Sequence, residues 1–158
     1  MEPWQRLDHA PADDAHALLA QCCGSTRWVD AMIARRPFGN AAALTDAASS
    51  IWLGLTEADW REAFSHHPKI GDRNARGIAA REQAGAAVAS DEVIGALADA
   101  NREYEARFGY IFIVCASGKS AEEMLAALRG RLNNDAATEI RIAAREQERI
   151  TKLRIQSL

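Results

Sequence analysis

The hydrophobic residues of this sequence recur at helical spacing along almost its whole length, in stretches that open with helix-capping residues. The clearest stretch follows Ser25, which can cap a helix whose apolar face holds Trp28, Val29, Met32 and Ile33. Alanine is frequent while glycine and proline are few, which also favours helix over sheet. At 158 residues the chain has the size of one domain. We therefore predict an all-α fold, a single-domain bundle of about eight helices over residues 1–158.

Caps and helix-breaking residues give approximate bounds for these helices. The first helix is expected over residues 11–22, and Pro37 ends the helix that Ser25 caps. The later helices are expected over 40–54, from Thr56 toward His67, from Ser90 to Gly109, from Ser120 to about 132, and over the last stretch, which carries Ile140, Ala143, Ile150 and Leu153.

One segment does not fit the helical pattern. The run from Tyr110 to Ala116 is apolar throughout and rich in β-branched and aromatic residues, which favour extended backbone. Because every neighbouring segment is predicted to be helical, a strand here would have no partner. We expect residues 110–116 to form extended or short helical backbone buried inside an α fold.

Charge and cysteine content set limits on partners and cofactors. A net charge of −3 without a long basic cluster gives no indication of a nucleic-acid or anionic-membrane partner. No apolar run approaches the ~20 residues that span a bilayer, and no signal-peptide pattern is visible, so we expect a cytoplasmic protein. The three cysteines, Cys22, Cys23 and Cys115, form a poor disulfide framework, which favours a reducing compartment. CxxC and HExxH motifs are missing, so we predict no metal site.

The first candidate for chemistry is His66-His67-Pro68. Histidine is the side chain best suited to proton transfer near neutral pH. Since a residue before proline is pushed out of the helical region, His67 is expected at a helix end or turn, on a fixed backbone. Residue type alone favours a simpler interpretation, an exposed helix end that happens to carry two histidines.

Other candidates are weaker when taken one at a time. Glu82 beside Gln83 could orient a histidine or pair with a ring bearing NH and C=O groups, although a solvated helix face is the commoner reason for such a pair. Arg154 could bind a carboxylate, or could simply pack along the surface. Cys115 is more readily a buried structural thiol than a nucleophile. Ser117-Gly118-Lys119-Ser120 is not a phosphate loop, because Ile113 stands where that motif needs glycine.

Taken together and in order, several short segments resemble the 2-oxo-4-hydroxy-4-carboxy-5-ureidoimidazoline (OHCU) decarboxylase family. The resemblance covers nearly the whole chain. Its segments are Cys23-Gly24-Ser25 with Trp28, Arg36-Pro37-Phe38, His67-Pro68 with Ile70-Gly71, Glu82-Gln83, Asn101 with Tyr104 and Phe108-Gly109-Tyr110, residues 112–118, Arg131-Leu132 with Asn134, and Glu146 with Ile150 and Leu153-Arg154.

The resemblance implies an all-α enzyme without a cofactor, usually a homodimer, that acts on a small ureidoimidazoline in urate breakdown and yields (S)-allantoin and CO₂. It implies His67 as the catalytic acid and Glu82 as its neighbour at the substrate. Many relatives carry serine where this chain has Ala79, which changes one expected substrate contact. The residues that it implies for substrate binding are Pro68, Ala79, Gln83, Phe112, Ile113, Val114, Ala116 and Arg154.

Two other classes of protein remain open from the residues alone. A non-enzymatic helical interaction module would expose an apolar stripe and have no pocket at His67. A hydrolase that uses Cys115 as nucleophile would place a histidine beside that thiol and would be inactivated by alkylation.

Overall fold

The computed structural model describes residues 1–71, 81–87 and 89–158 of the chain, and every regular element within them is a helix. The all-α prediction is therefore confirmed. The chain divides into two compact units, one made of residues 1–63 with 147–158 and the other of residues 64–146. The single-domain organisation expected from length stays a prediction.

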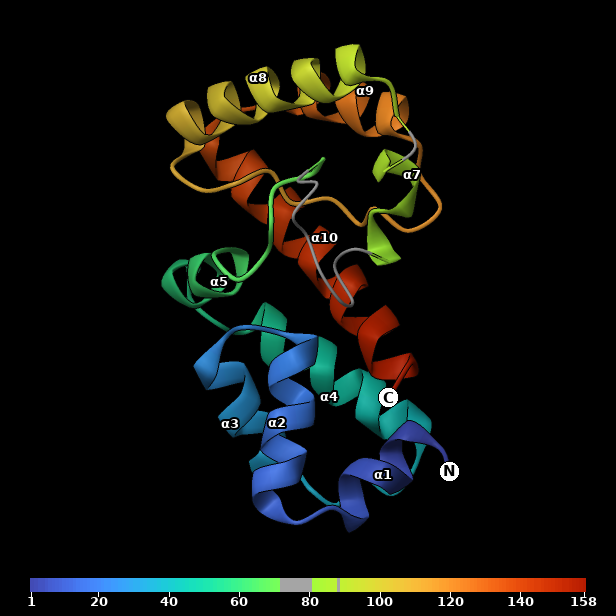
Figure 1. Ribbon diagram of the computed structural model, residues 1–158. Helices are drawn as coiled ribbons and strands as arrows, with labels where there is room; N and C mark the ends of the chain where they lie inside the picture. Colours follow the sequence, from blue (N-terminus) through green and yellow to red (C-terminus); the bar gives the residue numbers. More distant parts are fainter. Residues whose placement is uncertain (72–80, 88) are drawn as a thin grey trace. The chain divides into compact units, whose positions relative to one another are not determined.

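The first unit is built from short helices and the end of the long C-terminal helix (Figure 1). Helix α2 (Ala12–Cys22) packs against α3 (Thr26–Ala34), which in turn contacts α4 (Ala41–Leu53), and α1 (Pro3–His9) contacts both α2 and α4. The core of this unit is apolar, with Leu7, Leu19, Trp28, Met32 and Leu44 almost wholly buried.

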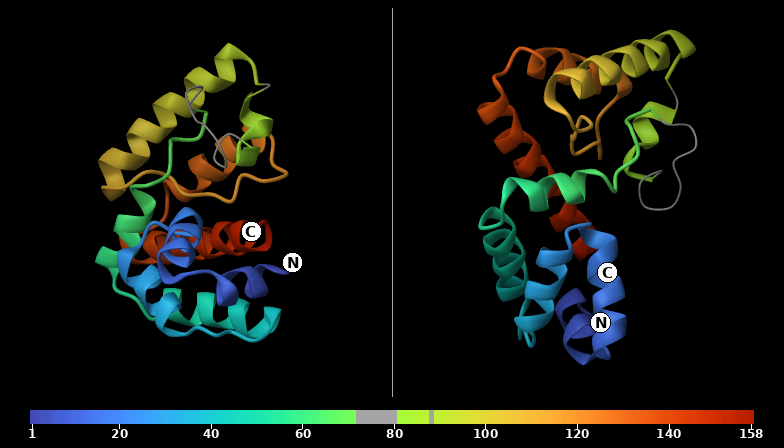
Figure 2. Two further views of the ribbon diagram at one scale, coloured as in Figure 1. Left: turned by 60° about the horizontal axis from the view of Figure 1, so that its bottom comes forward. Right: turned by 90° about the vertical axis from the view of Figure 1, so that its left-hand side faces the viewer.

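The second unit contains α7 (Ala84–Ala87), α8 (Asp91–Phe108) and α9 (Ala121–Arg131). Helices α8 and α9 pack side by side, as the views in Figures 1 and 2 agree. Two further helices, α5 (Glu57–Phe64) and α10 (Ala136–Gln156), contribute residues to both units.

The capping residues chosen from the sequence begin the helices as expected. Ser25 accepts a hydrogen bond from the Trp28 amide, and Ser90 accepts one from the Val93 amide. Ser120 and Glu123 form the full capping box of α9. The helix expected to begin at Thr56 is α5, where the Asp59 amide donates to the Thr56 hydroxyl and the Asp59 carboxylate accepts from the Thr56 amide.

Two expectations at the ends of the chain were wrong. The helix expected over residues 11–22 is present as α2, but it is not the first, because α1 precedes it. The start of α1 was missed since its capping box is made by Glu2 and Gln5, without the usual Ser, Thr, Asn or Asp. Leu153 is 41% exposed although it was placed on the buried stripe of the last helix. The buried stripe there runs through Gln147, Thr151 and Ile155, and Leu153 points about 200° away from Thr151 on the helical wheel.

No helix in the described ranges is long and apolar enough to cross a membrane.

Candidate active site

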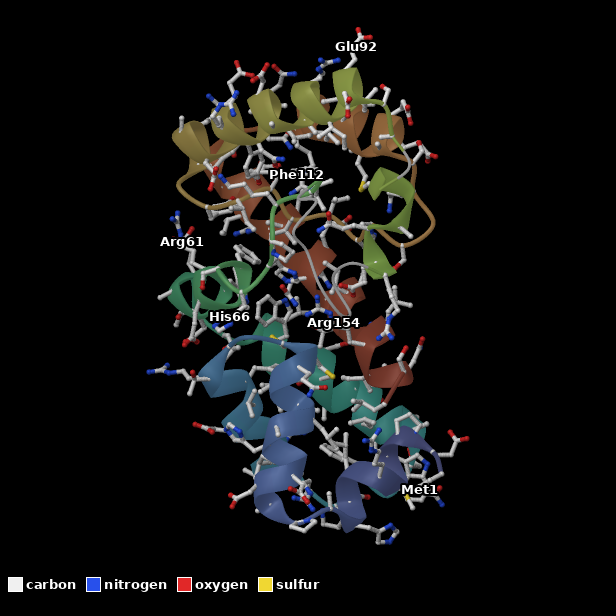
Figure 3. The ribbon with its side chains drawn as sticks, in the orientation of Figure 1. Met1, Arg61, His66, Glu92, Phe112 and Arg154 are labelled. Carbon is white, nitrogen blue, oxygen red and sulfur yellow. The ribbon has the colours of Figure 1, made fainter. Side chains whose placement is uncertain are left out.

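His67 stands in a turn that α5 and an aromatic contact hold in place. Helix α5 ends at Phe64, and the His67 amide donates to the Phe64 carbonyl at 3.2 Å. The Phe64 ring packs against Tyr110, with ring centroids 5.3 Å apart. His67 and Pro68 are half-buried, whereas His66 is exposed just beyond α5 (Figure 3). The prediction that His67 lies at a helix end or turn is confirmed. His67 is half-buried, which distinguishes it from the exposed His66.

Side chains from elsewhere in the second unit hold the three residues that follow Pro68. Lys69 forms an ion pair with Glu105 of α8 at 2.9 Å. Asn101, also on α8, donates from Nδ2 to the Ile70 carbonyl at 3.2 Å. Residues 69 and 70 therefore have anchors on α8 that hold the chain after His67 in place.

Gly71 completes this turn in a conformation that favours glycine. Its φ is +86°, in the left-handed region, and its amide donates to Gln83 Oε1 at 3.0 Å. Gln83 was predicted to bind substrate, and here its carboxamide oxygen binds the turn while its Nε2 end is the donor left for other use. Gln83 is buried and Glu82 is half-buried, so the pair does not lie on a fully solvated face.

The segment 110–116 is buried, without regular secondary structure, and is drawn as an extended trace in Figure 1. Charged side chains hold its backbone in place of a neighbouring strand. Arg131 donates to the Ile113 carbonyl at 2.6 Å, Glu146 accepts from the Cys115 amide at 3.2 Å, and Lys119 donates to the Cys115 carbonyl at 2.7 Å. The expectation of extended backbone inside an α fold is confirmed.

The hydrogen bonds of this segment follow the alternation of extended backbone. In such backbone the amide and carbonyl of one residue point to the same edge, and those of the next residue point to the opposite edge. The bonds above fall on Ile113 and Cys115, which share one edge. The amide and carbonyl of Val114, on the other edge, make no hydrogen bond within the described residues. Val114 is only 5% exposed, and buried backbone groups rarely lack partners, so this edge is suited to binding a ligand.

The last helix places Arg154 in the first unit. Arg154 is half-buried, and its guanidinium donates to the Gln21 carbonyl at 3.4 Å. Burial raises the pKa of Cys22 to about 12 and that of Cys23 to about 11, while the positive charge of Arg154 opposes both shifts. Whether Arg154 acts together with His67 stays a prediction.

A sequence model of the family described as OHCU decarboxylase matches residues 8–156 of this chain. The chain belongs to the OHCU decarboxylase family. The resemblance found from its short segments is therefore confirmed.

Individual members of the family agree with this assignment. The chain is 38% identical over 146 residues to the uric acid degradation bifunctional protein TTL of Arabidopsis thaliana, a match that covers 87% of this chain and 45% of the plant protein. The chain thus spans less than half the length of that relative. It is 30% identical over 130 residues to the 2-oxo-4-hydroxy-4-carboxy-5-ureidoimidazoline decarboxylase of Amia calva, covering 78% of this chain and 74% of the fish protein.

Solved structures match the fold. An OHCU decarboxylase crystallised in the presence of (S)-allantoin is 34% identical, with a TM-score of 0.81 over 94% of this chain and 97% of that one. A crystal structure of (S)-allantoin synthase, 18% identical, has a TM-score of 0.75 over 98% of this chain and 53% of the other, and shows the fold alone.

The structure brings many of the predicted OHCU decarboxylase site residues into one compact unit. His67, Pro68, Glu82, Gln83, Phe112, Ile113, Val114 and Ala116 all belong to residues 64–146. Ala79 lies outside the described residues. Among those described, no group of three or more His, Cys, Asp or Glu side chains could hold a metal ion.

Several side chains that shape the site were not predicted to do so. Asn101 stands in one of the family segments, but its bond to the Ile70 carbonyl was not predicted. Arg131 and Glu146 stood within the family segments without an assigned role. For these residues the signal in the sequence was polarity at a buried position, and the partner could come only from the fold.

The features of the two competing classes fit this member of the OHCU decarboxylase family poorly. Burial raises the pKa of the Cys115 thiol, which keeps it protonated and unsuited to nucleophilic attack. In the described part of the chain the large exposed hydrophobic side chains are Met1, Leu53 and Leu153, which are scattered along the sequence and form no helical stripe.

Proposed function

We propose that this chain decarboxylates 2-oxo-4-hydroxy-4-carboxy-5-ureidoimidazoline to (S)-allantoin and CO₂, with His67 as general acid and without a cofactor. Family membership supports the reaction. One observation of the molecule supports the assignment of the site. A half-buried histidine on a fixed turn lies in the same compact unit as the buried backbone edge at Val114, which has no hydrogen-bond partner among the described residues.

The chemistry needs positioning and proton transfer more than an added electron acceptor. When the bond from ring carbon to carboxylate breaks, its electron pair forms a double bond to the neighbouring ring carbon, and the nitrogen of the C=N bond takes up the displaced pair. That nitrogen takes up a proton and becomes a ring NH. A second proton then reaches the neighbouring carbon from one face, and the hydroxyl loses its proton as its carbon becomes a carbonyl, so the net change is the uptake of one proton and the release of CO₂. Because the substrate accepts its own electrons, pyridoxal or thiamine is not required.

Each group of the site has a part in this scheme. His67, oriented by Glu82, supplies the proton from a fixed side, which sets the configuration of allantoin. The free edge at Val114, with Gln83 Nε2, pairs with the NH and C=O groups of the ring and the ureido arm. Pro68, Phe112, Ile113 and Ala116 line the pocket, and Arg154 neutralises an anionic or carbonyl group. Ala79 has no hydroxyl to offer where many relatives have serine, so backbone groups take a larger part in binding the substrate.

The proposal extends to the state of the protein in the cell. We propose a homodimer that binds a small molecule rather than nucleic acid and works in the cytoplasm. The net charge of −3 and three free, buried cysteines support this environment. Light scattering coupled to size-exclusion chromatography tests the dimer, and a monomer mass at micromolar concentration would contradict it.

His67→Asn tests the catalytic assignment, with His66→Asn as its matched control. A general acid contributes about 10²–10⁴-fold, so kcat of His67→Asn is expected to fall by that factor with the helical circular dichroism unchanged. His66 is exposed, and its replacement is expected to leave kcat unchanged.

The assay generates the unstable substrate from urate with upstream enzymes and follows the circular dichroism of (S)-allantoin. No acceleration by the wild-type protein over the spontaneous rate would refute the reaction. Near-wild-type turnover of His67→Asn would refute the role of His67 alone.

A further inference from the structure

Residues from two of the family segments, Tyr104 from one and Arg131 with Asn134 from the other, meet at a buried carboxylate. Glu139 of α10 is fully buried, and its Oε2 accepts hydrogen bonds from the Tyr104 hydroxyl and from Arg131, whose Nε lies at 2.9 Å and Nη2 at 2.5 Å. Its Oε1 accepts from Asn134 Nδ2 at 3.0 Å. A buried carboxylate persists only when it is paired and hydrogen-bonded, and this one is satisfied at both oxygens.

The other side of the Arg131 guanidinium reaches the extended segment. Its Nη1 donates to the Ile113 carbonyl at 2.6 Å, and its central carbon lies 4.4 Å from the centroid of the Phe112 ring. Tyr104 packs against the same ring edge-on, with centroids 5.4 Å apart (Phe112 is labelled beneath α8 in Figure 3). The guanidinium thus joins the fully buried Glu139 to the backbone of residue 113.

The planar fork of arginine suits this bridge. It offers five N–H donors in fixed directions, so it can hold a carboxylate with one edge and a carbonyl with another. Lysine keeps the charge but presents a single nitrogen and cannot reproduce both contacts.

We propose that Glu139 and Arg131 are positioning residues, which set the direction of segment 112–116 and thereby turn the free backbone edge at Val114 toward the substrate. The inference rests on the proposed function for the identity of that substrate. Its physical basis is the alternation described above: a carbonyl of Ile113 bound by Arg131 directs the amide and carbonyl of Val114 to the opposite edge. Neither positioning residue is required to touch the substrate.

Arg131→Lys and Glu139→Gln test the proposal, with Arg129→Lys as matched control because Arg129 is an exposed arginine of the same last turn of α9. We expect the Val114 edge to bind the substrate equally well before and during the reaction, so its displacement should raise KM about tenfold and leave kcat within about twofold. A rise of this size corresponds to the loss of about one hydrogen bond between neutral groups. Arg129→Lys is expected to match the wild type.

Hydrogen exchange supplies a readout that does not depend on activity. The Cys115 amide is bonded to Glu146, and its exchange in folded Arg131→Lys is expected to accelerate about tenfold, while amides in the middle of α2 are unchanged. If Glu139→Gln loses its helical circular dichroism, Tyr104→Phe takes its place, because it keeps the ring and removes only the hydroxyl donor to Glu139. That variant is expected to raise KM about threefold.

The outcomes separate this proposal from the proposed function. Wild-type KM and wild-type Cys115 exchange in every folded variant, whatever the change in Tm, would show a purely structural network and overturn the inference. A wild-type protein without decarboxylase activity would refute the proposed function, and the exchange of Cys115 would still decide whether Arg131 positions the segment.

Discussion

Replacing Gly71 by alanine tests whether the turn after His67 controls the chemistry. Gly71 has a φ of +86°, and its amide donates to Gln83. A Cβ added there would meet Ile94 Cδ1 at 3.5 Å and Leu97 Cδ1 at 3.6 Å, which are ordinary contacts. The substitution therefore acts through backbone strain and not through a steric clash. Gly39 is a matched control, since its φ is +81° and a Cβ there would meet nothing within 4 Å.

The expected loss of stability is the same for the two variants. A non-glycine residue in the left-handed region costs about 1–2 kcal/mol. For a chain of this size that cost corresponds to a fall in Tm of about 2–8 °C. The kinetics are expected to differ, because only Gly71 lies four residues from His67 and is tied to the Gln83 side chain. A displacement of about 1 Å at a reacting group can cost about a hundredfold in rate. We expect Gly71→Ala to lower kcat/KM at least about tenfold and Gly39→Ala to leave it unchanged.

Urea unfolding and the circular dichroism assay for (S)-allantoin measure the two effects separately. Equal losses of stability with unequal kinetics would support a turn that positions His67. Unchanged kcat/KM in Gly71→Ala, with the expected loss of stability, would show that the geometry of residues 69–71 does not reach the reacting atoms. Equal kinetic losses in both variants would show that strain anywhere in the chain impairs activity, which also refutes the reasoning.

Two further predictions concern ionisable groups. Burial raises the pKa of Cys22 to about 12 and that of Cys23 to about 11, and it also raises the pKa of Cys115. Iodoacetamide at pH 8 is therefore expected to leave the folded protein unlabelled and active, and to label all three thiols after unfolding. Rapid labelling of Cys115 with loss of activity would instead support a thiol nucleophile. The hydrogen bond from the Thr138 amide, at 2.7 Å, lowers the pKa of Asp135 below its usual value. The ionised carboxylate therefore stabilises the fold above the unfolded-state pKa of about 3.9. This contribution is lost as pH falls through the lower folded-state pKa. Asp135→Ala is therefore expected to lower Tm at pH 7 by more than at pH 3, and a difference in Tm that does not vary with pH would contradict this.

The helices could be predicted from the sequence because their starts are local events. Ser25, Ser90 and Ser120 each bond the amide three positions ahead, a spacing that can be recognised from the sequence. The errors have the same local origin. Glu2 caps α1 although glutamate is not a usual capping residue. Leu153 lies two residues from both Thr151 and Ile155, which turns it away from the buried face of α10.

The position of His67 could also be predicted, because Pro68 acts on the residue directly before it. The partners of the site could not. Arg131 lies 18 residues from Ile113 in the sequence, Glu146 lies 31 residues from Cys115, and Asn101 lies 31 residues from Ile70. No spacing rule joins such pairs, and only the packing of α8, α9 and α10 in the second unit brings them within hydrogen-bond distance.

The same physical requirement links the fold of the second unit to its proposed chemistry. An extended segment in an all-α environment has no neighbouring strand, so its buried amides and carbonyls need other partners. On one edge, Arg131 binds the Ile113 carbonyl, and Lys119 and Glu146 bind the carbonyl and amide of Cys115. Charged side chains thus replace bonds that a neighbouring strand would make with its backbone. The opposite edge, at Val114, keeps a donor and an acceptor side by side, the arrangement that a ring with adjacent NH and C=O groups can pair with. A second strand would have covered that edge, and the described residues contain none, so the edge stays available for the proposed substrate, which is rich in amide-like groups.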